Sequence, residues 1–305
     1  MIKWMRENRQ TVARGAGSIL ALALLVVLIQ EQGDGQLFSA LRRVSITYFL
    51  FAVVALLISR VFAATRWHIL LKSANVNSSY LRSIMLTFTG NFSSNFLPTT
   101  IGGDMVRLGG AMQLGYDRAI CLASLVVDRL IGMIGMALAL PLGLIPALSL
   151  SNEIVQSFSI AGLFQKGMDF GKRTMESFSI WWKKPLALTS SLFATFGNQI
   201  FIYLSIYLLL LGINHHISYW LVAGMYTLTY FVTLIPISIN GLGVQELTMT
   251  FLLVQLGGLS SSESATIALL TRLMFILTSL PGAFFLPSIL AAINEKKVDV
   301  SKEGT

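Results

Sequence analysis

The sequence contains few charged residues. Only 12% of its 305 residues are charged, whereas about a quarter are charged in an ordinary soluble chain, and 54% are hydrophobic. It contains a single cysteine, Cys121, which excludes an internal disulfide. Gly/Ser linkers and low-complexity tracts are missing as well. This composition excludes a soluble globular domain.

The sequence also lacks the motifs of common catalytic sites. It has no H-E-x-x-H, no G-x-S-x-G and no Walker-type phosphate loop. His215 and His216 are adjacent and therefore lack the i,i+4 spacing of a helical metal pair. We therefore expect no catalytic residue, no metal and no cofactor, and a protein that is not an enzyme. The net charge of +8 fits loops that face anionic head groups better than it fits nucleic-acid binding.

The sequence contains long hydrophobic stretches with almost no charged residues. Nearly uncharged blocks occupy residues 16–29, 44–59, 119–150, 186–211, 217–236 and 265–293. A helix needs about 20 apolar residues to cross about 30 Å of hydrocarbon, and several blocks reach that length. We predict an all-α polytopic membrane protein of about eight transmembrane helices, forming one transmembrane domain over residues 1–305.

Lysine and arginine orient the predicted spans. They gather before the first span, over residues 66–82 and in the C-terminal tail. Because cytoplasmic loops are enriched in these residues, we expect both termini and the 66–82 loop in the cytoplasm of a multi-pass cell-membrane protein. Residues 151–184 are rich in aromatic side chains and predict an amphipathic segment that lies on the membrane surface.

Two polar, glycine-containing motifs interrupt the hydrophobic pattern, at residues 88–115 and 236–258. In each, a proline precedes a glycine by five residues: Pro98 before Gly103, and Pro236 before Gly241. Three apolar crossings separate the motifs, and an odd number of crossings reverses direction. We therefore predict an inverted repeat with two broken or re-entrant helices, its halves at about 44–148 and 186–293, joined by the amphipathic segment 151–184. Re-entrant hairpins and kinked full spans both fit; the five basic residues of 151–184 favour full spans.

The first motif offers an anion site. A half-helix beginning near Gly102, capped by Thr99 or Thr100, directs its free N–H groups and positive dipole end at a ligand. Gly102 and Gly103 let a head group approach the backbone, and Arg107 adds a bidentate phosphate contact. The alternative is a tight interhelical turn in which Asp104 and Arg107 form a local ion pair.

The second motif places Gly241 and Gly243 before a helix that carries Glu246. This carboxylate stabilises the helix end, pairs with an intramembrane arginine or carries a proton; the sequence leaves all three open.

Charged residues within the apolar blocks need partners, since each costs about 2.5–3.5 kcal/mol near the centre of a span. Asp128 and Arg129 point about 100° apart on a helix and must pair separately. We expect Arg129 to pair with Glu246 and Asp128 with Arg272, either as struts or around a polar cavity. Arg60 is expected to extend toward the membrane surface.

The order of these motifs resembles the transmembrane region of the lysylphosphatidylglycerol synthase/flippase family, over roughly residues 15–290. The motifs are Asn95-Phe-Leu-Pro98, Gly102-Gly103-Asp104 with Arg107, Asp128-Arg129-Leu130, Pro236-Ile-Ser238 with Gly241, Gly243 and Glu246, and Arg272 with Pro281-Gly282. Thr99, Asp128, Asn240 and Gln245 depart from the family pattern; the missing arginine at Gln245 puts a head-group contact there in doubt. The resemblance implies lipid translocation and, without an aminoacyl-transferase domain, no synthase activity.

We therefore expect a lipid flippase or transporter that moves an amphipathic, phosphate-containing lipid or lipid-linked precursor between leaflets. Its expected partners are membrane lipids with anionic head groups, with a lipid-modifying enzyme and a second copy of the chain as further candidates. The runner-up is a membrane enzyme or enzyme subunit acting on polyprenyl-linked sugars; a partner-binding scaffold is a third. The expected substrate-binding residues are Gly102, Gly103, Asp104, Arg107, Asp128, Arg129, Gly241, Gly243, Glu246 and Arg272.

Overall fold

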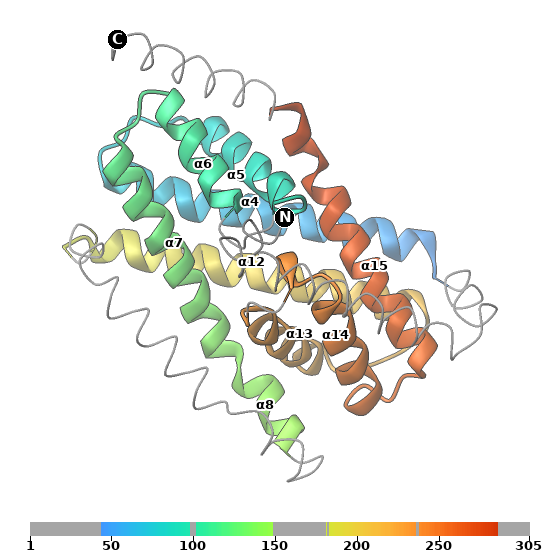
Figure 1. The fold of residues 1–305 in the computed structure, drawn as a ribbon. Coiled ribbons are helices and arrows are strands. Elements are labelled where there is room, and N and C mark those ends of the chain that lie inside the picture. Colours follow the sequence, from blue (N-terminus) through green and yellow to red (C-terminus); the bar gives the residue numbers. More distant parts are fainter. Residues whose placement is uncertain (1–43, 98–101, 149–180, 182, 236–237, 286–305) are drawn as a thin grey trace, which may run out of the picture.

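The described part of the chain is entirely helical. The computed structural model describes residues 44–97, 102–148, 181, 183–235 and 238–285, which contain no strand. Figure 1 shows their arrangement. The α-helices are α4 (Ile46–Ser73), α5 (Tyr80–Ser94), α6 (Gly102–Gln113), α7 (Arg118–Ala139), α8 (Pro141–Leu148), α12 (Pro185–Gly212), α13 (Tyr219–Thr233), α14 (Val244–Gln255) and α15 (Ser261–Ser279); η1 (Ile239–Gly241) and η2 (Leu280–Phe284) are 3-10 turns. Pro98, Thr99, Thr100, Pro236 and nearly all of the expected amphipathic segment 151–184 lie outside the described residues.

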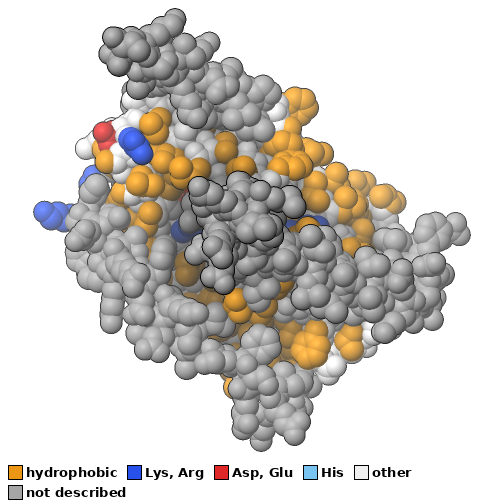
Figure 2. All heavy atoms as spheres, viewed as in Figure 1, with side chains coloured by type: hydrophobic (Ala, Val, Ile, Leu, Met, Phe, Trp, Pro, Cys, Tyr) orange, Lys and Arg blue, Asp and Glu red, His pale blue; other side chains and the backbone are white. Residues whose placement is uncertain are grey.

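Four stretches of the described chain are long and apolar enough to cross a membrane. They are Ile46–Ser73, Arg118–Leu148, Pro185–Gly212 and Ser261–Phe284. Many large hydrophobic side chains on them are exposed, including Phe51, Phe193 and Phe284, and apolar atoms dominate the coloured surface in Figure 2. Such a surface suits lipid rather than water. The chain is therefore a multi-pass, helical membrane protein.

The first span is longer than its apolar block predicts. Helix α4 continues without interruption through Arg60 and Arg66 to Ser73. The prediction that residues 66–82 form a loop is therefore wrong for Arg66, which lies within α4 and is buried. Only a short connection, residues 74–79, separates α4 from α5, where Ser79 accepts a hydrogen bond from the Arg82 N–H and caps the helix.

Helices α5 and α6 form a tight antiparallel hairpin. They contain 15 and 12 residues, so they are about 22 Å and 18 Å long, too short to cross about 30 Å of hydrocarbon. Leu86 in the middle of α5 packs in one cluster with Leu108 in the middle of α6. Near the tip, a Cβ at Gly103 would overlap the carbonyl oxygen of Gly90, so the two backbones touch. The chain therefore enters and leaves this motif at the same end.

Helices α13 and α14 form a second hairpin of the same size. They also contain 15 and 12 residues. At the base His215 Nε2 donates to the Gly257 carbonyl over 3.0 Å, and near the tip Gly241 packs against Thr233. The stretch 217–236, expected to be a full span, is thus one arm of a hairpin. These lengths favour re-entrant hairpins and do not support the preference for full spans at the two motifs.

The two 28-residue helices, α4 and α12, pack antiparallel along their whole length (Figure 1). The Ser45 N–H donates to the Gly212 carbonyl over 2.9 Å at one end. At the other end, the Lys184 ammonium donates to the Ser73 carbonyl. Each helix leads directly into one hairpin, so the two hairpins begin at opposite ends of this helix pair.

Candidate functional site

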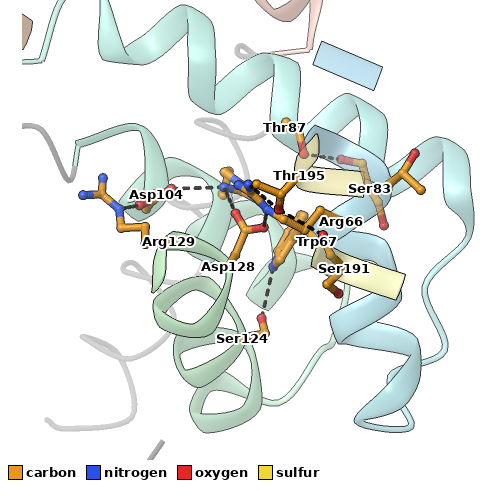
Figure 3. Close-up of polar contacts among 12 residues, drawn as sticks. Arg66, Trp67, Ser83, Thr87, Asp104, Ser124, Asp128, Arg129, Ser191 and Thr195 are labelled. Atoms are coloured by element: carbon orange, nitrogen blue, oxygen red, sulfur yellow. Dashed lines mark hydrogen bonds and ion pairs between the residues drawn. The ribbon is translucent and has the colours of Figure 1, made fainter. Parts of the chain in front are cut away.

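Five charged side chains form a continuous chain of ion pairs between α4, α6 and α7. Arg66 Nε donates to Asp128 Oδ1 over 2.7 Å, and Arg107 Nη1 lies 3.3 Å from Asp128 Oδ2 and 3.2 Å from Asp104 Oδ1. Arg129 Nε donates to the other oxygen of Asp104. Figure 3 shows Asp128 beside Arg66 and Asp104 beside Arg129. Exposure rises along the chain, from 4% for the Asp128 side chain to 38% for Arg129.

This network is held by its surroundings. The Arg107 guanidinium lies over the Trp67 ring, 4.3 Å from its centroid. The Trp67 indole in turn donates to Ser124 Oγ over 3.0 Å, which fixes the ring between α4 and α7. Arg66 adds a long hydrogen bond of 3.4 Å to Thr195 of α12. Because buried ion pairs are stable only when every member keeps its partners, these contacts make the network rigid.

A smaller ion pair occupies the second half of the chain. Arg272 of α15 donates through Nε to Glu246 Oε1, and Glu246 Oε2 accepts a hydrogen bond of 2.7 Å from the Gly243 N–H. Glu246 therefore both caps α14 and pairs with an intramembrane arginine, two of the three roles left open by the sequence. Arg272 Nη1 also lies 3.5 Å from the Asn240 carbonyl.

The predicted partners were wrong, although the reason for separate partners was right. Arg129 pairs with Asp104 rather than Glu246, and Asp128 pairs with Arg66 and Arg107 rather than Arg272. Helices that follow each other along the chain pack together, so these ion pairs form between residues of the same half of the chain. Asp104 and Arg107 also form the local ion pair of the alternative interpretation.

Arg66 is the main site residue that the sequence reasoning missed. It was assigned to a loop because the apolar block ends at Ser59. The spacing could have indicated that Arg66 belongs to the helix. Arg66 follows Ser59 by two helical turns, so a continuous helix places both side chains on one face. Both side chains are buried in the structure.

The glycines have structural explanations. A Cβ at Gly102 would overlap Leu97, and one at Gly103 would overlap Ser94 and Gly90, so both allow close packing in the first hairpin. Gly241 and Gly243 have φ of 71° and 79°, a left-handed backbone that favours glycine. Their contact with a head group stays a prediction. The start of α6 at Gly102 agrees with the expected half-helix.

Arg60 does not extend to the membrane surface as expected. It is the fifteenth residue of the 28-residue α4, and its guanidinium carbon lies 4.8 Å from the ring centroid of Phe275 in α15. Its Nε is buried without a hydrogen-bond partner, and no described carboxylate lies within 4.0 Å. A cation at mid-helix is too far from either end to reach the surface.

Positive charge exceeds negative charge among the charged side chains that face the interior of the described chain, although the four that are buried, Arg66, Arg107, Asp128 and Glu246, balance one another. Five arginines face three carboxylates: Arg60, Arg66, Arg107, Arg129 and Arg272 against Asp104, Asp128 and Glu246. Several guanidinium N–H groups, including Arg107 Nη2 and Arg272 Nη2, are buried without a partner. The arrangement is suited to an anionic ligand that accepts hydrogen bonds. No group of metal-binding side chains occurs within the described residues.

Comparison with known proteins identifies the family of this chain. Residues 15–165 and 152–282 match the model of the lysylphosphatidylglycerol synthase transmembrane region. The chain belongs to this family. The chain is also similar to a UPF0104 membrane protein of Pyrococcus horikoshii, 25% identical over 142 residues, which are 45% of this chain and 42% of that protein. A UPF0104 membrane protein of Methanothermobacter thermautotrophicus is 31% identical over 146 residues, 44% of this chain and 38% of that protein. The chain thus aligns with less than half of the length of either relative.

Proposed function

We propose that this protein moves an amphipathic lipid with a phosphate-containing head group between the leaflets of the cell membrane. The observation that carries the proposal is the excess of arginine over carboxylate where α4, α7 and α15 pack against the two hairpins. Unsatisfied buried guanidinium groups are costly unless a ligand completes them, and phosphate oxygens accept such donors in pairs. Membership of a family named for lipid synthesis supports a lipid as the ligand.

The proposed architecture is an inverted repeat around two re-entrant hairpins. Helices of 28, 15 and 12 residues follow each other in both halves, as α4, α5, α6 and as α12, α13, α14. The antiparallel packing of α4 against α12 gives the two halves opposite directions. Inverted repeats with interrupted helices are typical of transporters whose binding site lies near the middle of the membrane.

The two halves place one ion pair at equivalent positions, which suggests alternating access. Asp104 and Glu246 are the third residues of α6 and α14, and Arg129 and Arg272 are the twelfth residues of α7 and α15. In each half the arginine donates through Nε to that carboxylate. We propose that a head-group phosphate competes with the carboxylate for the arginine, first in one half and then in the other, while the acyl chains stay in the lipid.

Leaflet exchange in proteoliposomes tests the proposal. Head-group-labelled lipids are quenched from outside with dithionite, with wild-type protein compared against Arg129→Ala and Arg272→Ala. Protein-dependent exchange in the wild type that is lost in both variants supports translocation. Arg118→Gln at the exposed first residue of α7 is the control for loss of one positive charge. Normal exchange in both variants would mean that the arginines only hold the helices together. No exchange of anionic, zwitterionic or polyprenyl-linked lipids, with or without a proton gradient, would favour the enzyme-subunit alternative.

A further inference from the structure

Helices α7 and α15 both end at a leucine–proline step. Leu140-Pro141 follows α7, and Leu280-Pro281 follows α15. Proline lacks an N–H group and interrupts the i→i−4 hydrogen bonds of a helix, so each regular α-helix ends there. The short segments beyond these steps each contain a glycine, Gly143 in α8 and Gly282 in η2. We call α7 with α8, and α15 with η2, the two straps.

The first strap crosses to the hairpin of the other half. Gly143 lies against Gly224 of α13, the first arm of the second hairpin, and a Cβ at either glycine would overlap the backbone of the other. The two helix backbones therefore touch with no side chain between them. Such contacts between small residues are typical of tightly packed membrane helices. The contact leaves no room for α8 and α13 to approach further, and no rotamer change can relax it.

The second strap makes the corresponding contact with the first hairpin. A Cβ at Gly282 would overlap the carbonyl group of Phe88 in α5 and crowd the backbone nitrogen of Thr89. Three residues earlier, Ser279 Oγ accepts a hydrogen bond of 2.9 Å from the side-chain amide of Asn95, which directly follows α5. The end of α15 is therefore joined to the first hairpin by a backbone contact and by a hydrogen bond.

Each strap also holds the hairpin of its own half. Arg129 of α7 donates to Asp104 of the first hairpin, and Arg272 of α15 donates to Glu246 of the second. At about 1.5 Å per residue, the glycine contact lies about 20 Å beyond the ion pair in the first strap and about 15 Å beyond it in the second. Figure 1 shows α8 beside α13 and the end of α15 beside α5. Both straps therefore connect the same two hairpins, in opposite directions.

We infer that the two straps couple the hairpins mechanically, so that displacement of one hairpin also displaces the ion pair of the other. Movement of α5 must be followed by η2, because their backbones are in contact, and it reaches Arg272 through the rigid helix α15. Movement of α13 reaches Arg129 through α8 and α7 in the same way. Small displacements suffice, since a hydrogen bond forms only over a narrow range of distance and angle.

The coupling gives the proposed alternating access a physical basis. Two independent hairpins would at times be open together, whereas two coupled hairpins change state in concert. Coupling of this kind is reciprocal, so an effect of the first hairpin on the second requires an equal effect of the second on the first. The inference rests on the proposed function for its purpose, but the contacts that carry it do not depend on which lipid is moved.

Cysteine labelling in detergent measures the coupling without requiring transport. In the full-length protein carrying Cys121→Ala, single cysteines report on three places: Ser93→Cys in the first hairpin, Ser238→Cys in the second, and Ser205→Cys inside α12. These three serines are at most 5% exposed, so reaction with N-ethylmaleimide requires local opening. The labelling rate, followed by mass spectrometry, therefore measures how often each place opens.

Gly282→Ala and Gly143→Ala each disturb one strap. We expect each of them to accelerate the labelling of both hairpin reporters by about 10-fold or more, as expected for an overpacked contact, and to leave the Ser205→Cys rate unchanged. Asn95→Ala serves if the glycine variants fail to fold, because it removes only the hydrogen bond to the end of α15. It should accelerate the labelling of Ser238→Cys by about 3-fold.

Gly197→Ala is the matched control, because its methyl group would overlap the Phe62 ring between α4 and α12, away from both straps. It should not accelerate the hairpin reporters relative to Ser205→Cys. Acceleration confined to the hairpin that the substituted glycine touches, or equal acceleration at all three places, would overturn the coupling. Coupling in a protein that shows no leaflet exchange would retain the straps and reject the transport proposal, whereas exchange without coupling would retain transport and reject the straps.

Discussion

Ser59 donates a hydrogen bond to Asn198 over 2.5 Å, and the two residues occupy the same position, the fourteenth, in α4 and α12. Three residues further along, Phe62 and Phe201 are again equivalent, and their rings stack with centroids 5.7 Å apart. Equivalent residues of two antiparallel helices meet each other only where a two-fold axis passes between the helices. These contacts support the proposed inverted repeat, and place its axis at the middle of α4 and α12, next to Arg60.

The proposed topology predicts that two equivalent connections lie on opposite sides of the membrane. Asn77 follows α4 and His216 follows α12 by the same number of residues, and both are exposed. We expect Asn77→Cys to react with a membrane-impermeant maleimide from the cytoplasmic side and His216→Cys from the outside. Cys121, the one native cysteine, is buried and gives a low background. Labelling of both from the same side would exclude the inverted repeat.

Asp128 is predicted to be the charge whose loss damages the protein most, because it pairs with both Arg66 and Arg107. Asp128→Leu should destabilise the fold by about 3–5 kcal/mol by leaving buried arginines unpaired. The double variant Asp128→Leu with Arg66→Met should recover part of this loss, which thermal unfolding in detergent measures. Equal destabilisation in the single and double variants would show that Arg66 does not depend on Asp128.

Gly103→Ala should open the first hairpin. The added methyl group would overlap the backbone carbonyl of Gly90 as well as the Ser94 side chain, so a side-chain rotation cannot relieve it. We expect a loss of about 1–3 kcal/mol of stability, as for overpacked cores. Combining it with Ser94→Ala removes the side-chain overlap only and should restore little. Full recovery in that double variant would show that the α5 backbone is free to move away.

The sequence predicted the class of protein, a helical membrane protein, but it did not predict which charged side chains contact each other. Apolar blocks and scattered intramembrane charges identified a helical membrane protein, and the glycine motifs located both hairpins. The charge partners depended on which helices touch, which a single sequence does not encode, so Arg129 was paired with the wrong carboxylate. Arg66 was assigned to a loop and Arg60 to the end of a span because the apolar block stops at Ser59, whereas α4 continues to Ser73.

Glu246→Gln separates the roles of this carboxylate. The amide oxygen of glutamine can still accept the Gly243 N–H and cap α14, while the charge that compensates Arg272 is lost. If the ion pair is the working element, this variant should insert but should exchange lipid at least about 10-fold more slowly, because a phosphate held by an uncompensated Arg272 is released slowly. Loss of the carboxylate charge from this buried pair should also lower the free energy of unfolding, by up to about 3–5 kcal/mol. Its binding of dioctanoyl phosphatidylglycerol should be tighter than that of the wild type. Glu246→Ala is the comparison that also removes the cap, and should be less stable than Glu246→Gln by about a further 1 kcal/mol. Unchanged exchange in Glu246→Gln would reduce Glu246 to a helix cap, whereas wild-type exchange that follows a pH gradient and loses that dependence in the variant would assign it a proton.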